Sequence, residues 1–267
     1  MINIAVAGAA GKMGSRITAL SKEYEGIRLA GAFEKKGHVD VGKDVGILAG
    51  IGETGIRLSA GIEAIIDTVD LVIDFTSVES TKENLKSASG KGKAMIIGTT
   101  GFSKDDLKEI KALTKIIPCV LASNMSLGVN LLLKVLHDIA RVLGDDYDIE
   151  IVEAHHRLKK DAPSGTALKM AQVIADAVNR NLEEVAVYAR KGVIGQRTKK
   201  EIGIQTIRAG DIVGEHTVLF GGLGERIEIT HKASSRDTFA RGALKAALWL
   251  AGKPAGLYDM QDVLGLR

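Results

Sequence analysis

The chain has 267 residues, of which 45% are hydrophobic and 26% are charged, and its formal net charge is +3. This length and apolar content indicate a packed globular protein with one large domain or two medium ones. The small net charge, carried by basic residues that are not interleaved with aromatic ones, argues against a nucleic-acid partner.

Targeting signals are not evident in the sequence. No apolar run is long enough to span a bilayer and no cleavable secretion signal begins the chain, so we expect no membrane partner. The single cysteine, Cys119, excludes an internal disulfide and suits a reducing, cytoplasmic environment. It lies in an apolar run over residues 116–121, so we expect a buried core residue rather than a nucleophile.

A glycine-rich turn joins the first expected strand, residues 2–8, to a helix that reaches residue 24. The spacing of Gly8, Gly11 and Gly14 is weak evidence alone, but a strand before it and a helix after it form the context of a dinucleotide-binding fingerprint. Glycines let the backbone approach a diphosphate, whose charge the helix N-terminus attracts. The residues expected to contact the cofactor here are Gly8, Ala9, Ala10, Gly11, Lys12 and Met13.

The second expected strand, residues 27–33, ends at Glu34. This acid follows the last fingerprint glycine by about twenty residues, where a carboxylate accepts hydrogen bonds from the adenosine ribose. Lys35 and Lys36 come next and supply positive charge. Alternatively, Glu34 simply ends a strand and the glycines form a tight turn, but the combination favours dinucleotide binding. Residues 36–61 are expected to form a loop with short strands.

Strands are next expected over residues 71–76, 94–97 and 116–121, alternating with a helix over 79–89 and one that opens at Ser103. This alternation predicts a parallel, doubly wound sheet with its ligands at the carboxyl ends of the strands. Two segments at such ends are expected to line the nicotinamide half of the cofactor: Gly98, Thr99 and Thr100, and Ala122, Ser123, Asn124 and Met125.

A second domain is expected to begin with an apolar helix over residues 127–143. Short strands over 200–208, 213–220 and 225–231 are separated by tight turns, which indicates a mixed or antiparallel sheet. The last helix is expected over 236–251, with Ser234 or Ser235 near its N-cap and Gly252 after its end.

The chemistry is expected in the segment 153–166, between a strand over 148–152 and a helix that Ser164 caps. This charged loop holds His155, His156 and Lys159, and the helix start adds the backbone N–H groups of Gly165 and Thr166. The segment therefore predicts a receptor for a small, multiply charged anion, although a solvated basic loop is the alternative. A zinc site on the two histidines is disfavoured because adjacent residues of an extended segment point apart, so we expect no metal.

These residues resemble the dihydrodipicolinate reductase family over nearly the whole chain, most strongly in segments 98–101, 153–167, 208–216 and 229–236. The resemblance implies an α/β fold: a Rossmann-like doubly wound parallel sheet plus an inserted α+β substrate domain with a mixed sheet. Residues 1–126 plus 236–267 would form the dinucleotide-binding domain, and 127–235 the substrate-binding and oligomerisation domain of a homotetramer.

The resemblance also implies a reaction of lysine and diaminopimelate biosynthesis, in which NADH or NADPH gives hydride to C4 of a cyclic imine dicarboxylate. The substrate arrives as 4-hydroxy-tetrahydrodipicolinate and loses water. His155 and Lys159 would be proton donors, and which of them protonates which atom stays open. His156, Lys159, Gly165, Thr166 and Thr100 would bind the substrate, and Glu34 and Lys35 the cofactor.

Two rival functions share the dinucleotide fingerprint. One is another two-domain oxidoreductase that acts on a sugar or an amino acid, but it leaves the His-His-Arg-x-Lys loop and the Ser-Gly-Thr helix start unexplained together. The other is a non-catalytic nucleotide sensor, which needs no proton donor. Lys35 stands where many family members have arginine, so the preference between NADH and NADPH stays open.

Overall fold

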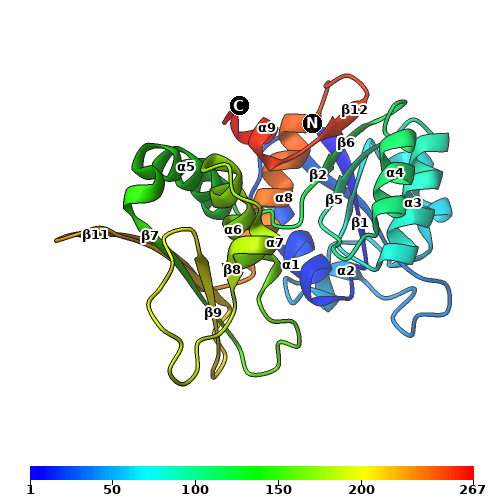
Figure 1. The fold of residues 1–267 in the computed structure, drawn as a ribbon. Coiled ribbons are helices and arrows are strands. Elements are labelled where there is room, and N and C mark those ends of the chain that lie inside the picture. The colour runs from blue at the N-terminus through cyan, green and yellow to red at the C-terminus, as the bar shows by residue number, and fades with distance from the viewer. The chain divides into compact units, whose positions relative to one another are not determined.

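The structure, a computed structural model, describes residues 1–267 and divides them into two compact units. Unit 1 consists of Met1–Leu127 together with Arg236–Arg267, and unit 2 of Gly128–Ser235. In Figure 1, unit 1 is drawn from blue to green and again from orange to red, and unit 2 from green to orange. None of the helices is both long and apolar enough to cross a membrane.

Unit 1 is built on a seven-stranded sheet of order β12-β6-β5-β4-β1-β2-β3, in which every pair of neighbours is parallel. This confirms the expected doubly wound parallel sheet. Its strands are β1 (Ile2–Ala7), β2 (Ile27–Glu34), β3 (Ser59–Ala60), β4 (Leu71–Asp74), β5 (Ala94–Ile97), β6 (Pro118–Leu121) and β12 (Gly256–Tyr258).

Helices cover both faces of this sheet (Figure 1). Side chains of β1 alternate between two cores, because Ile4 and Val6 pack against α1 and α8 while Ala5 and Ala7 pack on the side of α3 and α4. The helical elements are α1 (Lys12–Ser21), α2 (Val45–Leu48), η1 (Ile62–Ala64), η2 (Ile66–Thr68), α3 (Val78–Gly90), α4 (Lys104–Leu113), α8 (Asp237–Leu250) and α9 (Met260–Leu264). Cys119 of β6 is buried, as expected, and burial raises the pKa of its thiol well above the usual range.

The start of α8 lies next to the two serines that the sequence analysis named. Its N-cap is Arg236, whose own side chain forms no capping hydrogen bond, and Ser234 and Ser235 directly precede it. The carboxylate of Asp237 accepts two hydrogen bonds from Arg16 of α1, at 2.7 and 2.8 Å. A long-range ion pair therefore anchors this helix end.

Unit 2 holds a five-stranded mixed sheet of order β11-β10-β7-β9-β8. Strands β7, β9 and β8 are parallel, whereas β10 is antiparallel to both β7 and β11, which confirms the mixed sheet. Its elements are α5 (Leu127–Leu143), η3 (Gly144–Asp146), β7 (Asp148–His155), α6 (Gly165–Ala177), α7 (Leu182–Val185), β8 (Ala186–Val187), β9 (Ile202–Arg208), β10 (Gly214–Gly221) and β11 (Arg226–Ala233).

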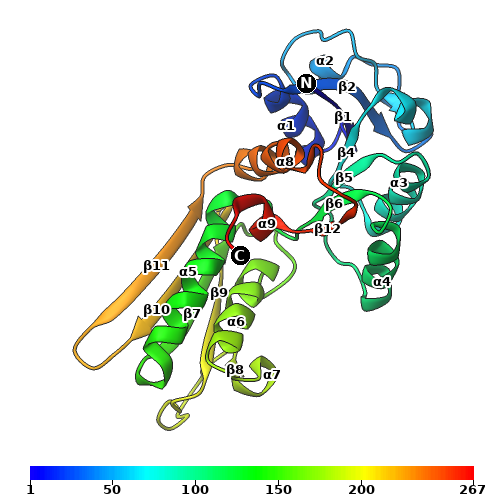
Figure 2. The ribbon, with the colours of Figure 1, turned by 90° about the horizontal axis from the view of Figure 1, so that it is seen from above.

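Helices α5 and α6 cover one face of this sheet, as Figure 2 shows. Leu136 of α5 and Met170 of α6 pack with Ile149 and Ile151 of β7, all of them buried. The expectation that β7 ends at Val152 is wrong. The strand runs on to His155, because the alternation of inward and outward residues continues and neighbouring strands extend the ladder on both sides.

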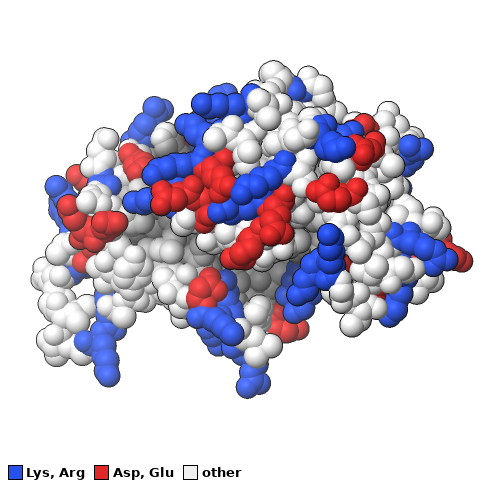
Figure 3. Space-filling view, turned by 90° about the vertical axis from the view of Figure 1, so that its right-hand side faces the viewer, with Lys and Arg blue, Asp and Glu red and all other residues white.

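Basic and acidic side chains alternate over the face of the molecule drawn in Figure 3. Within unit 1, Lys82 of α3 pairs with Asp106 at 2.7 Å and with Glu109 at 2.8 Å, both on α4. The helix α4 itself begins with a capping box between Ser103 and Asp106, as the sequence predicted.

Candidate functional site

The glycine-rich turn of unit 1 closes tightly between β1 and α1. Gly8 has φ of +64°, and a Cβ atom on Gly14 would lie 2.1 Å from the carbonyl oxygen of Gly8, so no side chain fits there. The N-cap of α1 is Gly11, which offers no side chain to the first amide groups of the helix. Lys12 and Met13 form the first turn, so this helix start is shaped to receive an anion with its backbone.

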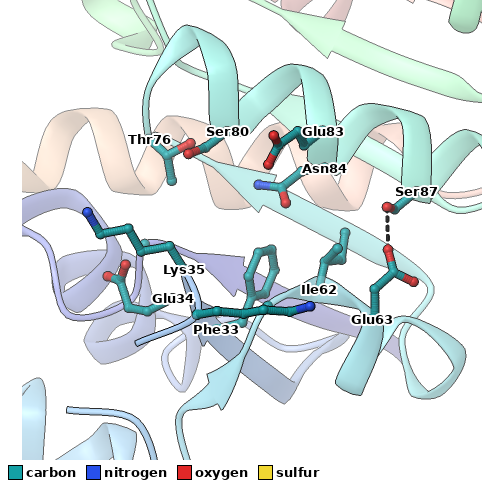
Figure 4. A pocket seen from close by; sticks show the side chains of 13 residues that line it. Phe33, Glu34, Lys35, Ile62, Glu63, Thr76, Ser80, Glu83, Asn84 and Ser87 are labelled. Carbon is teal, nitrogen blue, oxygen red and sulfur yellow. Dashed lines mark hydrogen bonds between the residues drawn. The ribbon is translucent and has the colours of Figure 1, made fainter. Parts of the chain in front are cut away.

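A cavity of about 410 Å³ lies beside this turn, between the end of β2 and helix α3 (Figure 4). Glu34 Oε1 accepts a hydrogen bond of 3.2 Å from the amide of Ala10, which ties the end of β2 to the glycine-rich turn. The cavity is lined by Gly8, Phe33, Glu34, Lys35, Lys36, Gly61, Ile62, Glu63, Thr76, Ser80, Glu83, Asn84 and Ser87. Three residues assigned to the cofactor from sequence, Gly8, Glu34 and Lys35, thus border one cavity.

The other expected cofactor residues follow strands of the same parallel sheet. Gly98, Thr99 and Thr100 come after β5, and residues 122–125 come after β6, so both turns lie at the carboxyl edge of the sheet. Ala122 is half-buried and Ser123 is exposed, and Asn124 Oδ1 accepts a hydrogen bond from the amide of Ser126 at 2.9 Å. The Met125 side chain packs in the core and is 1% exposed, so it presents no side-chain atoms to a ligand.

A buried acid that the sequence reading missed supports this edge. Asp74, the last residue of β4, is completely buried. Its Oδ1 accepts hydrogen bonds from the hydroxyl groups of Thr76 at 2.6 Å and Thr81 at 3.0 Å, and its Oδ2 accepts from Asn84 at 2.8 Å. Thr76 and Asn84 line the cavity, so Asp74 fixes two of its walls through neutral donors. An acid within a strongly apolar strand was the available signal.

In unit 2 a row of polar side chains crosses the face of the sheet that the helices cover. Glu153 of β7 lies opposite Thr206 of β9 on one side and His216 of β10 on the other, and His216 lies opposite His231 of β11. The inward residues of β7 before Glu153 are Ile149 and Ile151, both buried. The row therefore replaces the apolar core at one end of the sheet.

Glu153 is completely buried and is the centre of this row. It accepts both hydrogen bonds of the Arg208 fork at 2.8 Å, one on each oxygen. Oε2 also faces His155 Nδ1 at 2.6 Å. Oε1 also accepts from the amide of Ser164 at 3.0 Å and the hydroxyl of Thr206 at 3.2 Å. Burial alone would raise the pKa of Glu153, but the bonds from Arg208, His155 and Ser164 outweigh it and hold that pKa below its usual value.

The two histidines of the motif lie in different environments. His155 ends β7, its side chain is 12% exposed, and burial lowers its pKa although Glu153 opposes that shift. Its ring meets the ring of His216 edge-on, with centroids 5.2 Å apart. His156 follows the strand and is half-buried, and its Nδ1 has no hydrogen-bond partner in the chain.

Lys159 is ordered by an acid within the same loop. Its Nζ lies 2.8 Å from Asp161, its side chain is 20% exposed, and the contact lowers the pKa of Asp161. The backbone carbonyl oxygen of Asp161 in turn accepts from Arg208 at 2.6 Å. The loop that carries Lys159 is therefore tied to the Glu153–Arg208 pair.

Ser164 caps α6, as the sequence predicted, by accepting from the amide of Ala167 at 3.2 Å. Its hydroxyl also lies 3.0 Å from Nε2 of His216. His216 is only 4% exposed, and this burial, together with the nearby His155, lowers its pKa to about 4. Gly165 begins the helix, its amide donates to no group of the chain, and Thr166 follows.

Unit 2 thus brings together His155, His156, Lys159 and the Gly165–Thr166 helix start, as the sequence predicted. Sequence reading did not single out Glu153, Arg208 and His216 as functional. For Glu153 a signal existed, since a charged residue occupies an inward position of an alternating strand. Arg208 and His216 reach the site only through strand pairing with distant segments.

Comparisons with known proteins agree along the chain. The sequence model described as dihydrodipicolinate reductase, N-terminus, matches residues 2–125, and the corresponding C-terminus model matches residues 128–264. The 4-hydroxy-tetrahydrodipicolinate reductases of Syntrophobacter fumaroxidans and Syntrophus aciditrophicus are 58% and 55% identical, covering 100% of both chains in each comparison.

One solved structure extends the comparison to the fold. A dipicolinate-bound dihydrodipicolinate reductase from Paenisporosarcina sp. TG-14 superposes with a TM-score of 0.75 at 24% identity and covers 98% of each chain. Sequence relatives and both sequence models therefore lead to one assignment: this chain belongs to the dihydrodipicolinate reductase family.

Proposed function

We propose that this chain reduces 4-hydroxy-tetrahydrodipicolinate, by way of dihydrodipicolinate, to tetrahydrodipicolinate in lysine and diaminopimelate biosynthesis. It is an oxidoreductase that depends on a nicotinamide dinucleotide, as the names of its full-length relatives imply. The observation that carries the proposal is that contacts draw the motif segment together at the end of β7. Glu153 holds both the ring of His155 and the amide of Ser164, which directly precedes Gly165, and the amide of Lys159 donates to the carbonyl oxygen of His156. Such a site suits a small dicarboxylate that must be both bound and protonated.

Unit 1 is the proposed dinucleotide-binding domain, and its residues fit that group. The uncapped start of α1 offers backbone amides to the diphosphate. Glu34 borders the cavity beside Gly8, where the hydroxyl groups of an adenosine ribose would donate hydrogen bonds to its carboxylate. When bound, the nicotinamide supplies hydride. Lys35 and Lys36 border the same cavity and offer charge to a 2′-phosphate, so both NADH and NADPH should be used.

Unit 2 is the proposed substrate domain. A planar dicarboxylate needs cationic and N–H partners, and His156, Lys159, Gly165 and Thr166 are assigned to it. No atom of the chain lies within 4 Å of a Cβ built on Gly165, so the chain itself does not require a glycine there. Close approach of a ligand to the backbone explains why a glycine is useful. The assignment of Thr100 to the substrate rests on the family resemblance alone.

Proton donors are required because hydride addition leaves a conjugated system that must be protonated. The Nδ1 atom of His155 lies 2.6 Å from Glu153, which holds the ring in place, and burial lowers the pKa of this histidine. The Nζ atom of Lys159 lies 2.8 Å from Asp161. These two residues are therefore assigned to the chemical step.

The proposal extends to assembly and location. The family resemblance implies a homotetramer built through the unit 2 sheets, and Ile207 of β9, whose surface is 46% exposed, is one apolar side chain that such an interface would cover. A biosynthetic step that consumes a nicotinamide dinucleotide suits the cytoplasm.

The decisive assay follows NADH and NADPH oxidation with substrate made in situ from pyruvate and aspartate semialdehyde. Oxidation that requires both precursors supports the proposal. Dinucleotide binding without oxidation would instead favour a nucleotide sensor, and turnover of a sugar or a different amino acid derivative would favour another oxidoreductase.

A further inference from the structure

Glu153 offers only lone pairs to its neighbours. The guanidinium of Arg208 occupies both of its oxygens at 2.8 Å, and a bidentate pair of this kind requires an ionised carboxylate. An ionised carboxylate accepts hydrogen bonds and donates none. His155 Nδ1, at 2.6 Å from Oε2, must therefore carry the hydrogen of that bond.

This arrangement leaves Nε2 as the chemically available atom of His155. No group of the chain forms a hydrogen bond with Nε2, while the side chain keeps 12% of its surface exposed. Strand β10 passes close to the same atom at Gly214, where a Cβ would lie 3.1 Å from Nε2. The glycine thus leaves room beside the free nitrogen.

We propose that Glu153 is a positioning residue, which holds the proton of His155 on Nδ1 and directs Nε2 toward the substrate, with Arg208 as its fixed counter-charge. The inference rests on the proposed role of His155 and deepens it. In the chemical step the Nε2 proton of the imidazolium moves to the conjugated system left by hydride addition. The ring is then neutral, with Nδ1–H still bonded to Glu153.

The charges around His155 show what Glu153 contributes. Lys159 in the loop and Arg208 on β9 both disfavour a positive charge on the His155 ring. His216 on β10, with His231 beyond it, brings no negative charge to the ring. Asp161 is engaged by Lys159. Glu153 is therefore the carboxylate that stabilises the imidazolium, and without it the ring would lose its proton at a lower pH.

The tautomer can be measured without any assay of activity. Nitrogen-15 spectra of the imidazole rings, with His155 assigned by comparison with a His155→Asn variant, distinguish the two neutral forms. Above the ring's titration we expect Nδ1–H in the wild type and Nε2–H in Glu153→Gln, where an amide can face Nδ1 with its own hydrogens. A wild-type ring protonated on Nε2 would overturn the inference even if the enzyme reduces its substrate normally.

Kinetics test whether this tautomer matters. Replacing the carboxylate that orients the histidine of a serine-protease triad costs about 10⁴-fold in kcat through the wrong tautomer. We expect Glu153→Gln to lower kcat by ~10²-fold or more. The pH above which kcat declines should also move to a lower value, while dinucleotide affinity stays unchanged.

The matched control is Thr206→Val, which removes the 3.2 Å hydrogen bond to the same carboxylate but leaves its contact with His155. It should lower kcat much less and leave the pH profile in place. Equal losses in the two variants, or a loss in Glu153→Gln with an unmoved pH profile, would assign Glu153 a structural role only. Should Glu153→Gln not fold, the wild-type tautomer and an Arg208→Lys variant, expected to show an intermediate loss, decide the matter.

Discussion

Helix α1 of unit 1 and helix α6 of unit 2 both begin beside a proposed anionic ligand, but the residues at the two helix starts differ in kind. Gly11 precedes α1 without a side-chain cap, whereas Ser164 caps α6 with its hydroxyl. Gly14 is imposed by the chain, since its Cβ would meet the Gly8 carbonyl oxygen at 2.1 Å, while a Cβ on Gly165 would meet nothing within 4 Å. The fold requires the glycine at α1, whereas at α6 the glycine is assigned to the proposed ligand.

The two units also differ in what surrounds a buried acid. Asp74 in unit 1 and Glu153 in unit 2 are both completely buried. Asp74 accepts hydrogen bonds from hydroxyl and amide groups, which do not titrate near neutral pH, whereas Glu153 is held by Arg208 and His155. Unit 1 is therefore suited to binding by fixed dipoles, and unit 2 to proton transfer.

The largest expected effect is that of Lys159→Met in unit 2. Loss of a general acid or of its charge should lower turnover by ~10²–10⁴-fold, while the affinity for dinucleotide stays normal because that site belongs to unit 1. Steady-state kinetics and a dinucleotide titration measure the two quantities. Lys160→Met, at an exposed neighbouring lysine, is the control and should remain active. Near-normal rates in both Lys159→Met and His155→Ala would contradict the assignment of unit 2.

Next in size is stabilisation by pyridine-2,6-dicarboxylate, which presents the two carboxylates of the proposed substrate on a planar ring. At ~100 times its dissociation constant the ligand should stabilise the fold by roughly 2.7 kcal/mol. Thermal melting with dinucleotide present measures this shift. An equal shift in a Lys159→Met, Thr166→Val double variant would place the ligand elsewhere, and no shift in the wild type would remove the dicarboxylate from the proposal.

A smaller effect should appear as a pH dependence of stability in unit 2. Burial lowers the pKa of His216 from 6.5 to about 4. Between these two pH values the unfolded chain therefore binds a proton at His216, whereas the folded chain does not. The stability is fully present above pH 6.5 and falls as the pH decreases toward 4. Between pH 7 and 5 this amounts to about 2 kcal/mol. Denaturant unfolding at the two pH values measures the free energy of unfolding, and its loss between pH 7 and 5 should be smaller by this amount in His216→Gln. An equal loss in the wild type and the variant would disprove the shift.

The smallest expected effect concerns Lys35, an exposed residue at the cavity of unit 1. Its attraction to a 2′-phosphate should be worth roughly 0.2–1 kcal/mol, so Lys35→Ala should weaken NADPH up to about fivefold and leave NADH nearly unchanged. Lys35→Arg should favour NADPH, and the modest preference of the wild type for NADH should shrink at low salt. Equal effects of Lys35→Ala on both cofactors would show that Lys35 does not contact the 2′-phosphate.

Much of the fold follows from short stretches of sequence. The glycine-rich turn, the apolar strands, the helix at residues 127–143 and the Ser103–Asp106 capping box all depend on neighbours a few residues apart, and the structure has each of them. The short elements β12, α7 and α9 were not predicted, because three to five residues carry too little periodicity to be recognised.

The sequence also made the motif residues evident, since they lie within one segment: His155, His156, Lys159, Gly165 and Thr166. It did not reveal the residues that hold this segment in place. Arg208 reaches Glu153 across 55 positions of the chain, and His216 reaches Ser164 across 52. No local pattern encodes such pairs, because strand order and register decide which distant residues meet. The sequence by itself therefore determined which groups are proposed to act, and only the tertiary structure decided which nitrogen of His155 has no partner in the chain.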